Sequence, residues 1–158
     1  MATSYLFEAY TIIKKNYNEL VLTTRKDLIF AKKQNLLNMS KIIVWHNPRC
    51  RKSREGLAAA EKTAKEKGLN LEIRKYLDNP PTEQELKKVL QWLGLKPIEL
   101  VRTKETVWKE NFKGKEMTDE QIIKAMVQYP KLIERPVVIY NDKAVLARPA
   151  DKVLELFS

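Results

Sequence analysis

The residues best suited to chemistry lie around Cys50, the single cysteine of this 158-residue chain. It stands in the run HNPRCRKSR at 46–54, between an apolar, β-branched stretch and an amphipathic stretch. A cysteine at such a strand-to-helix turn points its sulfur at the helix N-terminus, where free N–H groups and the helix dipole favour an anion. Because the thiolate is the nucleophilic form, this position predicts a reactive thiol with a pKa below the ordinary value of about 8.5. Four cations in the same turn favour the thiolate further: Arg49, Arg51, Lys52 and Arg54.

Two neighbours of Cys50 bear on this thiol. His46 adds positive charge if it is protonated. An equally favoured interpretation is that His46 is only a polar residue at the end of the strand. Ser53 occupies the place of the second cysteine in a C-x-x-C motif, so its hydroxyl can donate a hydrogen bond to the thiolate but cannot close a disulfide. For Cys50 itself the alternative is a buried structural cysteine. With one histidine and one cysteine in the chain, we expect no metal site.

Two Arg-Pro pairs, Arg135-Pro136 and Arg148-Pro149, flank a candidate hairpin far along the chain. The planar fork of arginine suits tetrahedral oxyanions such as arsenate or phosphate, and a solvated surface position is the alternative for either arginine. Proline is tolerated as the first residue of a strand, and in the expected fold Pro136 opens the hairpin and faces the cysteine turn. Pro136 is therefore a candidate cis-proline.

The elements that must position these residues are marked by hydrophobic spacing and by turn residues. The apolar run 41–45 predicts a buried strand, and helical spacing predicts a helix over 51–67 that stops at Gly68. Alternation predicts a second strand over 71–77. The remaining expected elements are helices that begin at the capping-box pairs Thr82/Glu85 and Thr118/Gln121, strands at 136–140 and 143–147 around an Asn141-Asp142 turn, and a helix at 150–157.

This order of elements predicts an α/β fold of thioredoxin-like plan. The first two strands, joined by a helix, should pair in parallel, and the hairpin should add two antiparallel strands. The result is a four-stranded mixed sheet with flanking helices and a helical insertion at about 82–128. Other small α/β sheets have similar length and periodicity.

A boundary is expected near residue 38. Residues 1–38 are polar and lack a capped element, so we interpret them as an N-terminal extension, either disordered or an over-extended start. Residues 39–158 are expected to form the folded domain, because so short an N-terminal piece could hardly hold its own core.

Composition excludes several function classes. The net charge is +10, but the cations are spread among acids without a basic block and interleaved aromatics, so we expect no nucleic-acid partner. No apolar stretch is long enough to span a membrane. A single unpaired cysteine favours the reducing cytoplasm.

Taken together, five segments resemble the glutaredoxin-linked arsenate reductase family, which has a thioredoxin-like fold. The resemblance extends over about 41–157. The segments are HNPRCRKSR at 46–54, YLDNPPTEQEL at 76–86, LVRTKE at 100–105, LIERPVV at 132–138 and ARPADKVLEL at 147–156.

The resemblance implies an activity and a set of site residues. Cys50 is then the nucleophile that attacks arsenate, and His46 and Ser53 favour its thiolate. Glutathione acts as co-substrate through a mixed disulfide, glutaredoxin restores the thiol, and no cofactor is bound. The oxyanion is bound by three arginines: Arg102, Arg135 and Arg148.

Two alternatives remain open at this point. One is a redox-responsive regulator of the Spx type, which shares the fold and binds RNA polymerase, although Cys50 and Ser53 cannot form its disulfide switch. The other is an orphan relative that binds an oxyanion or is glutathionylated without arsenate turnover.

Overall fold

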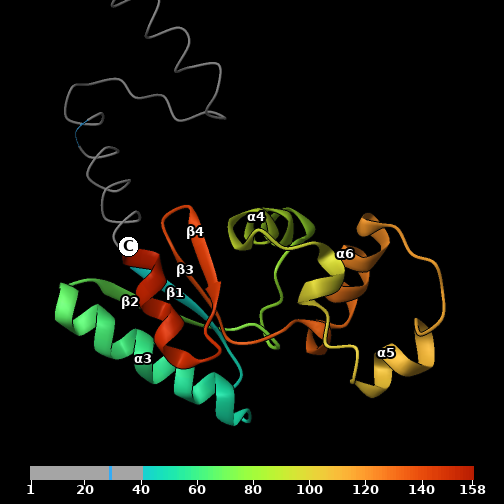
Figure 1. Cartoon of the computed structure of the whole chain (residues 1–158), viewed down its shortest axis with the longest axis horizontal. Helices are drawn as coiled ribbons and strands as arrows, with labels where there is room; N and C mark the ends of the chain where they lie inside the picture. The colour runs from blue at the N-terminus through green and yellow to red at the C-terminus, as the bar shows by residue number, and fades with distance from the viewer. Residues whose placement is uncertain (1–28, 30–40) are drawn as a thin grey trace, which may run out of the picture. The chain divides into compact units, whose positions relative to one another are not determined.

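The computed structural model describes residue 29 and residues 41–158, so the extension expected over 1–38 lies, apart from residue 29, outside the described residues. No helix in these ranges is long and apolar enough to cross a bilayer. The elements follow in the order β1 (Lys41–His46), α3 (Arg51–Lys67), β2 (Asn70–Lys75), α4 (Glu83–Leu93), η1 (Pro97–Leu100), α5 (Thr106–Asn111), α6 (Asp119–Gln128), η2 (Pro130–Leu132), β3 (Val137–Tyr140), β4 (Lys143–Leu146) and η3 (Ala150–Phe157) (Figure 1).

The four strands form one mixed sheet in the order β2-β1-β3-β4. β1 pairs in parallel with β2, which is possible because α3 carries the chain back between them. β3 runs antiparallel to both β1 and β4, and the pairing places Val44 opposite Ile73 on one side and Val138 on the other. The expected α/β fold with a four-stranded mixed sheet is therefore confirmed.

Two apolar layers cover the two faces of this sheet. Ile42 and Val44 of β1 pack in one layer, with small side chains of α3 and with η3. Trp45 lies in the other layer, which also contains Val89 of α4 and Met126 of α6. Because successive side chains of a strand point to opposite faces, β1 anchors both layers and is the buried centre of the fold.

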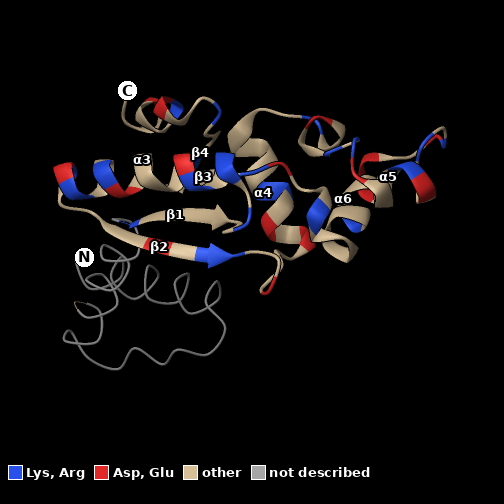
Figure 2. Ribbon diagram, turned by 90° about the horizontal axis from the view of Figure 1, so that it is seen from below, with Lys and Arg blue, Asp and Glu red and all other residues tan. Residues whose placement is uncertain are grey.

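The helix that follows the cysteine turn matches its sequence signals. α3 ends where Gly68 adopts a left-handed conformation, with φ of 64°, and its N–H turns back to the last carbonyls of the helix. Figure 2 shows both signs of charge along the exposed surface of α3 rather than a continuous basic stripe. Residues on its other side, including Ala60 and Ala64, are buried against the sheet.

β2 is shorter than the strand expected over 71–77. The chain turns after Lys75, whose carbonyl accepts hydrogen bonds from the N–H groups of both Asp78 and Asn79. This turn takes Tyr76 out of the strand, and its side chain is fully buried. Alternation along the sequence could not reveal the turn, because Tyr76 and Leu77 have the side chains of strand residues.

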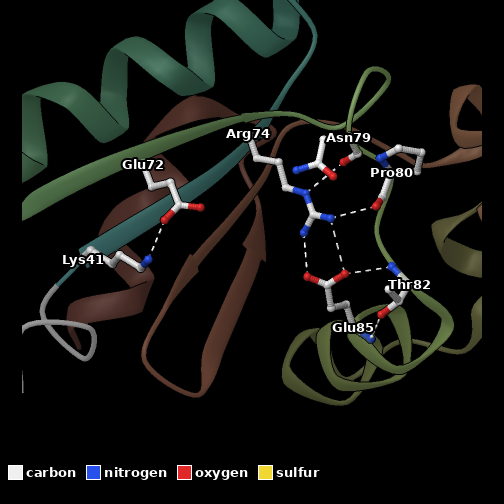
Figure 3. Close-up of polar contacts among 7 residues, drawn as sticks. All are labelled: Lys41, Glu72, Arg74, Asn79, Pro80, Thr82 and Glu85. Atoms are coloured by element: carbon white, nitrogen blue, oxygen red, sulfur yellow. Dashed lines mark hydrogen bonds and ion pairs between the residues drawn. The ribbon is translucent and has the colours of Figure 1, made fainter. Parts of the chain in front are cut away.

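Arg74 holds the connection from β2 to α4 in place (Figure 3). Its guanidinium donates to the carbonyls of Asn79 at 2.9 Å and Pro80 at 2.7 Å, and to Glu85 Oε1 at 2.7 Å. The Glu85 carboxylate also accepts from the N–H of Thr82, and the Thr82 hydroxyl accepts from the N–H of Glu85. The expected capping box is therefore confirmed. Six hydrogen bonds of Arg74 and of the Thr82/Glu85 capping box thus fix the loop that follows Tyr76.

The later part of the chain largely agrees with the sequence patterns. The helical insertion is confirmed as α4, η1, α5 and α6, and α6 begins at the Thr118/Gln121 capping box. The hairpin turns at Asn141, which has φ of 53°. The helix expected at 150–157 is present and is a 3-10 helix, η3. The Arg135–Pro136 bond is cis as expected, and so is Arg148–Pro149.

Candidate active site

Cys50 is the residue at which α3 begins. Its backbone is extended, with φ of −100° and ψ of 121°, and its carbonyl accepts the first helical hydrogen bond from Arg54 at 3.0 Å. The thiol is partly exposed. The backbone N–H groups of Lys52 and Ser53 face the sulfur, although neither closes a regular side-chain cap. The structure thus places the sulfur at a helix N-terminus, where an anion is stabilised.

The pKa of the Cys50 thiol is lowered. Burial raises this pKa, but the N–H of Ser53 outweighs it together with Arg135, which reaches the sulfur as a hydrogen-bond donor and as a positive charge. The N–H of Lys52 adds to the effect. The thiolate is therefore favoured, and its principal cation comes from a segment distant in the sequence.

Three of the four cations next to Cys50 in the sequence are bonded to groups other than the sulfur. Arg51 Nε donates to Glu55 at 2.8 Å, and Lys52 Nζ donates to the same carboxylate at 3.1 Å. These hydrogen bonds lower the pKa of Glu55, with Lys52 the larger cause. Arg54 donates to a backbone carbonyl of the preceding loop at 2.9 Å. Glu55 neutralises part of this cluster, and the cation that lowers the pKa of Cys50 most is Arg135.

His46 and Ser53 contact each other in the turn that carries Cys50. Nδ1 of His46 lies 3.0 Å from Oγ of Ser53, and the same oxygen accepts from the N–H of Asn47 at 2.9 Å. Burial lowers the pKa of His46, so its imidazole is neutral at neutral pH and adds no positive charge. Ser53 acts on the sulfur through its backbone N–H, while its hydroxyl is engaged with His46 and Asn47. These contacts fix the turn that carries Cys50.

Arg135 is joined to the buried phenol of Tyr76. Its Nη1 donates to Tyr76 Oη at 3.3 Å and lies 3.5 Å from the carbonyl of Lys131. Burial raises the pKa of Tyr76, so the phenol keeps its proton. The phenol oxygen accepts from Arg135, and its own O–H group remains a potential donor.

Close packing of α3 against the start of β3 brings Arg135 to the sulfur. At Gly56 of α3, an added Cβ would lie 2.3 Å from Cγ of Pro136 and 3.1 Å from Cβ of Ala147. The proline ring therefore occupies the space of a side chain at position 56. Glycine here permits the approach of two segments that are far apart in the sequence.

Arg102 and Arg148 are linked through Glu134. The segments that carry Arg102 and Glu134 pair as a short antiparallel bridge at Val101 and Ile133. Glu134 Oε2 lies 2.9 Å from Nη1 of Arg148 and 3.8 Å from Nε of Arg102. Arg102 also forms an ion pair with Glu105. The charges of Arg102, Arg135 and Cys50 all act on Tyr76, and Arg148 joins this group through Glu134.

Unpartnered polar atoms gather at this site. Within the described residues, the buried side-chain nitrogen and oxygen atoms without an oriented hydrogen bond are Arg102 Nη1, Glu134 Oε2, Arg135 Nε and Arg148 Nε. Arg102 Nη1 lies at ion-pair distance from Glu105, and Glu134 Oε2 lies at ion-pair distance from Arg148. Neither atom is aligned for a hydrogen bond. Buried polar groups are nearly always hydrogen-bonded, so such a cluster points to a ligand. Three of the four are N–H donors, which suits an anion with several oxygens.

The sequence analysis missed three residues of this site: Gly56, Tyr76 and Glu134. Tyr76 opens the segment singled out at 76–86, and Glu134 lies next to Arg135 in the segment singled out at 132–138. Gly56 had a visible signal, because a glycine inside a helix costs about 1 kcal/mol relative to alanine and so requires a packing reason. Among the described residues, no group of three or more His, Cys, Asp or Glu is placed to hold a metal ion.

The fold and site together define a class of protein. A mixed sheet, a cysteine at the N-terminus of α3 and a proline-led strand packed against that helix describe a thioredoxin-like protein with a single thiol at its site. The family model described as the ArsC family matches residues 45–156, so the chain belongs to that family.

Individual relatives agree with this assignment. The chain is 42% identical to "Uncharacterized protein YfgD" of Escherichia coli, over 73% of this chain and 96% of that protein. It is 37% identical to an arsenate reductase of Neisseria meningitidis, over 73% of this chain and 97% of that protein. The solved arsenate reductase of Vibrio cholerae matches with a TM-score of 0.66 and 39% identity, covering 74% of this chain and 98% of that one.

Proposed function

We propose that this protein is a thiol-dependent oxidoreductase that reduces arsenate to arsenite through Cys50. The observation that carries the proposal is the cluster of unpartnered N–H atoms on Arg102, Arg135 and Arg148 beside a cysteine with a lowered pKa. A tetrahedral oxyanion offers acceptor oxygens to such donors and an electrophilic central atom to the sulfur. Relatives named arsenate reductase support arsenate as that oxyanion.

The residues have separate roles in this proposal. Arg135 both stabilises the Cys50 thiolate and binds the oxyanion, and Arg102 and Arg148 bind its other oxygens. His46 and Ser53 hold the cysteine turn, so that the backbone N–H groups stay aimed at the sulfur. No bound cofactor is required, because the thiols supply the electrons.

The proposed reaction proceeds in three steps. The Cys50 thiolate attacks arsenic, an S–As bond forms, and one As–O bond breaks to release water after proton uptake. A glutathione thiolate then attacks the Cys50 sulfur; the S–As electron pair moves to arsenic, which leaves as arsenite. Glutaredoxin reduces the resulting Cys50–glutathione disulfide and restores the thiol.

An external thiol follows from the composition of the chain. Cys50 has no second cysteine to pair with, and Ser53 occupies the place of a resolving cysteine. The second sulfur must come from a partner, and glutathione is the abundant thiol of the reducing cytoplasm, where we place the reaction.

A second candidate function is supported by the single cysteine and by the similarity to YfgD, whose printed name gives no activity. In that case Cys50 is glutathionylated in response to oxidants without arsenate turnover. The two functions share the nucleophile and differ in whether arsenate is consumed. The single cysteine gives no support to a regulator of the Spx type that uses an internal disulfide switch.

The deciding experiment is a coupled assay of the purified chain with arsenate, glutathione and glutaredoxin, read out as nicotinamide oxidation by glutathione reductase. We expect arsenate-dependent oxidation by the wild type and none by Cys50→Ser. Arsenate-independent oxidation, or activity that survives in Cys50→Ser, would contradict the proposal. Omitting glutaredoxin should slow turnover without abolishing formation of the mixed disulfide.

A further inference from the structure

Glu134 places a carboxylate among the arginines of the site. Its backbone N–H donates to the carbonyl of Leu100 at 2.9 Å, which fixes its position at the bridge between the two segments. Its Oε2 atom lies 2.9 Å from Arg148 Nη1, is buried, and lacks an oriented hydrogen bond. The carboxylate therefore lies between Arg148 and Arg102, which both carry a buried nitrogen without an oriented hydrogen bond.

A carboxylate in this position opposes the binding of an anion. Two like charges in close contact repel each other, and the lower dielectric constant near a protein surface strengthens this repulsion relative to water. An ionised carboxylate can only accept hydrogen bonds. Repulsion becomes attraction only when the incoming anion carries a proton and donates it to Glu134 in a charge-assisted hydrogen bond.

We propose that Glu134 is a specificity-determining residue that accepts a hydrogen bond from an O–H group of the bound oxyanion. This inference rests on the anion site of the proposed function and narrows its substrate class. At neutral pH, arsenate and phosphate carry at least one O–H group, whereas sulfate carries none. The site therefore accepts protonated tetrahedral oxyanions and rejects sulfate, which has similar size and charge.

The expected discrimination is large. Sites that hydrogen-bond a hydroxyl of the ligand reject analogues without it by factors that reach about 10,000, because a buried group of the site is left unpaired. Here the group that loses the hydrogen bond is the Glu134 carboxylate, whose charge also repels the ligand. Since the site is partly open to solvent, we expect a factor of at least about 100 between phosphate and sulfate.

The test is anion binding to the full-length, reduced protein at neutral pH and matched ionic strength. Inorganic phosphate and sulfate are titrated separately, and binding is read as protection of Cys50 from iodoacetamide and as heat by calorimetry. The wild type should be protected by phosphate, and by sulfate only at about 100-fold higher concentration. Glu134→Gln should narrow this gap to less than about tenfold, mainly by gaining affinity for sulfate, since an amide can both donate and accept.

Glu105→Gln is the matched control. Glu105 forms an ion pair with the same Arg102 but has no ion pair with Arg148, so its substitution removes an equal charge from one side of the cluster. We expect it to keep the wild-type gap between the two anions. If Glu134 only neutralises the arginines, Glu134→Gln should instead raise both affinities by the same factor.

Three outcomes would overturn the inference: equal protection of the wild type by both anions, no protection by phosphate, or an unchanged gap in Glu134→Gln. The first two need no variant, so they hold even if Glu134→Gln fails to fold. The binding assay contains neither glutathione nor turnover. Selective phosphate binding without arsenate reduction would sink the proposed function alone, and arsenate reduction with equal competition by sulfate would sink this inference alone.

Discussion

The phenol of Tyr76 accepts a hydrogen bond from Nη1 of Arg135 at 3.3 Å, and Arg135 in turn reaches the sulfur of Cys50. Tyr76 directly follows β2, Arg135 precedes the hairpin, and Cys50 lies at the start of α3. Tyr76 is fully buried, so its position is determined by the core and by the turn after Lys75. The orientation of the cation that activates the thiol thus depends on the packing of the sheet.

Tyr76→Phe removes this hydrogen bond while keeping the aromatic ring. A hydrogen bond to a charged group contributes about 1.5 kcal/mol or more, so KM for arsenate should rise about tenfold. Because Arg135 lowers the pKa of Cys50, looser placement of Arg135 should also move the alkylation midpoint of the thiol to higher pH. Tyr140→Phe is the control, because Tyr140 packs on Phe157 in the other apolar layer. An unchanged KM and pH profile in Tyr76→Phe would show that the phenol only fills space.

Arg135→Ala should raise the pKa of Cys50 directly. In the wild type, alkylation by iodoacetamide should have its midpoint below about 8.5, and the variant should move it toward that value. Lys131→Ala removes an exposed cation of the same segment and should leave the midpoint in place. A wild-type midpoint at the value of free cysteine would contradict the activation of this thiol.

The same pKa shift predicts how stability depends on pH. Between the lowered pKa of folded Cys50 and the ordinary pKa of the unfolded chain, the unfolded state binds more protons, so the free energy of unfolding should rise with pH. This contribution is present above the unfolded-state pKa and is lost as pH falls through the folded-state pKa. Urea unfolding of reduced protein, compared between wild type and Arg135→Ala, should show a smaller rise in the variant.

Gly56→Ala should disturb the site through packing. Helix propensity alone favours alanine by about 1 kcal/mol, but the added Cβ would meet the rigid ring of Pro136 at 2.3 Å, and overpacking costs about 1–3 kcal/mol. We expect net destabilisation together with a higher pKa of Cys50, because Pro136 carries Arg135 away from the sulfur.

Gly68→Ala provides the contrast to this variant. An added Cβ at Gly68 meets nothing within 4 Å, but its φ of +64° costs an alanine about 1–2 kcal/mol. Both variants should lower the urea midpoint, and only Gly56→Ala should change the alkylation profile. Equal alkylation profiles would refute the packing argument.

The Arg74–Glu85 pair should contribute to stability and leave the chemistry unchanged. Glu85 has a lowered pKa, chiefly because Arg74 donates to it, so the contribution should be lost as pH falls through the folded-state pKa of Glu85. A double-mutant cycle with Arg74→Ala and Glu85→Ala should give a coupling of about 1 kcal/mol, since the carboxylate is partly exposed. Zero coupling would mean that the carbonyls of Asn79 and Pro80 account for the role of Arg74.

Local patterns were sufficient for much of the fold. The end of α3 at Gly68 and the two capping boxes depend on neighbours within a few residues, and all three are confirmed. The place of Cys50 at the start of α3 follows from the same kind of local information. The compensation of Arg51 by Glu55 was also readable, because residues four apart on a helix are neighbours.

Other features of the site depend on tertiary packing and have no local signal. Nothing near Glu134 in the sequence indicates that it lies between Arg102 and Arg148, since that arrangement requires the bridge at Val101 and Ile133. The neutral state of His46 follows from burial, which residue types in the turn do not reveal.

The account depends most directly on whether arsenate drives oxidation of Cys50. Reduced full-length protein is incubated with glutathione, with and without arsenate and without glutaredoxin, and intact mass is measured over time. We expect one glutathione to be added to Cys50 in step with the release of one arsenite, only when arsenate is present. Glutathione addition at the same rate without arsenate, or no addition with it, would contradict the assignment of this thiol site as an arsenate reductase.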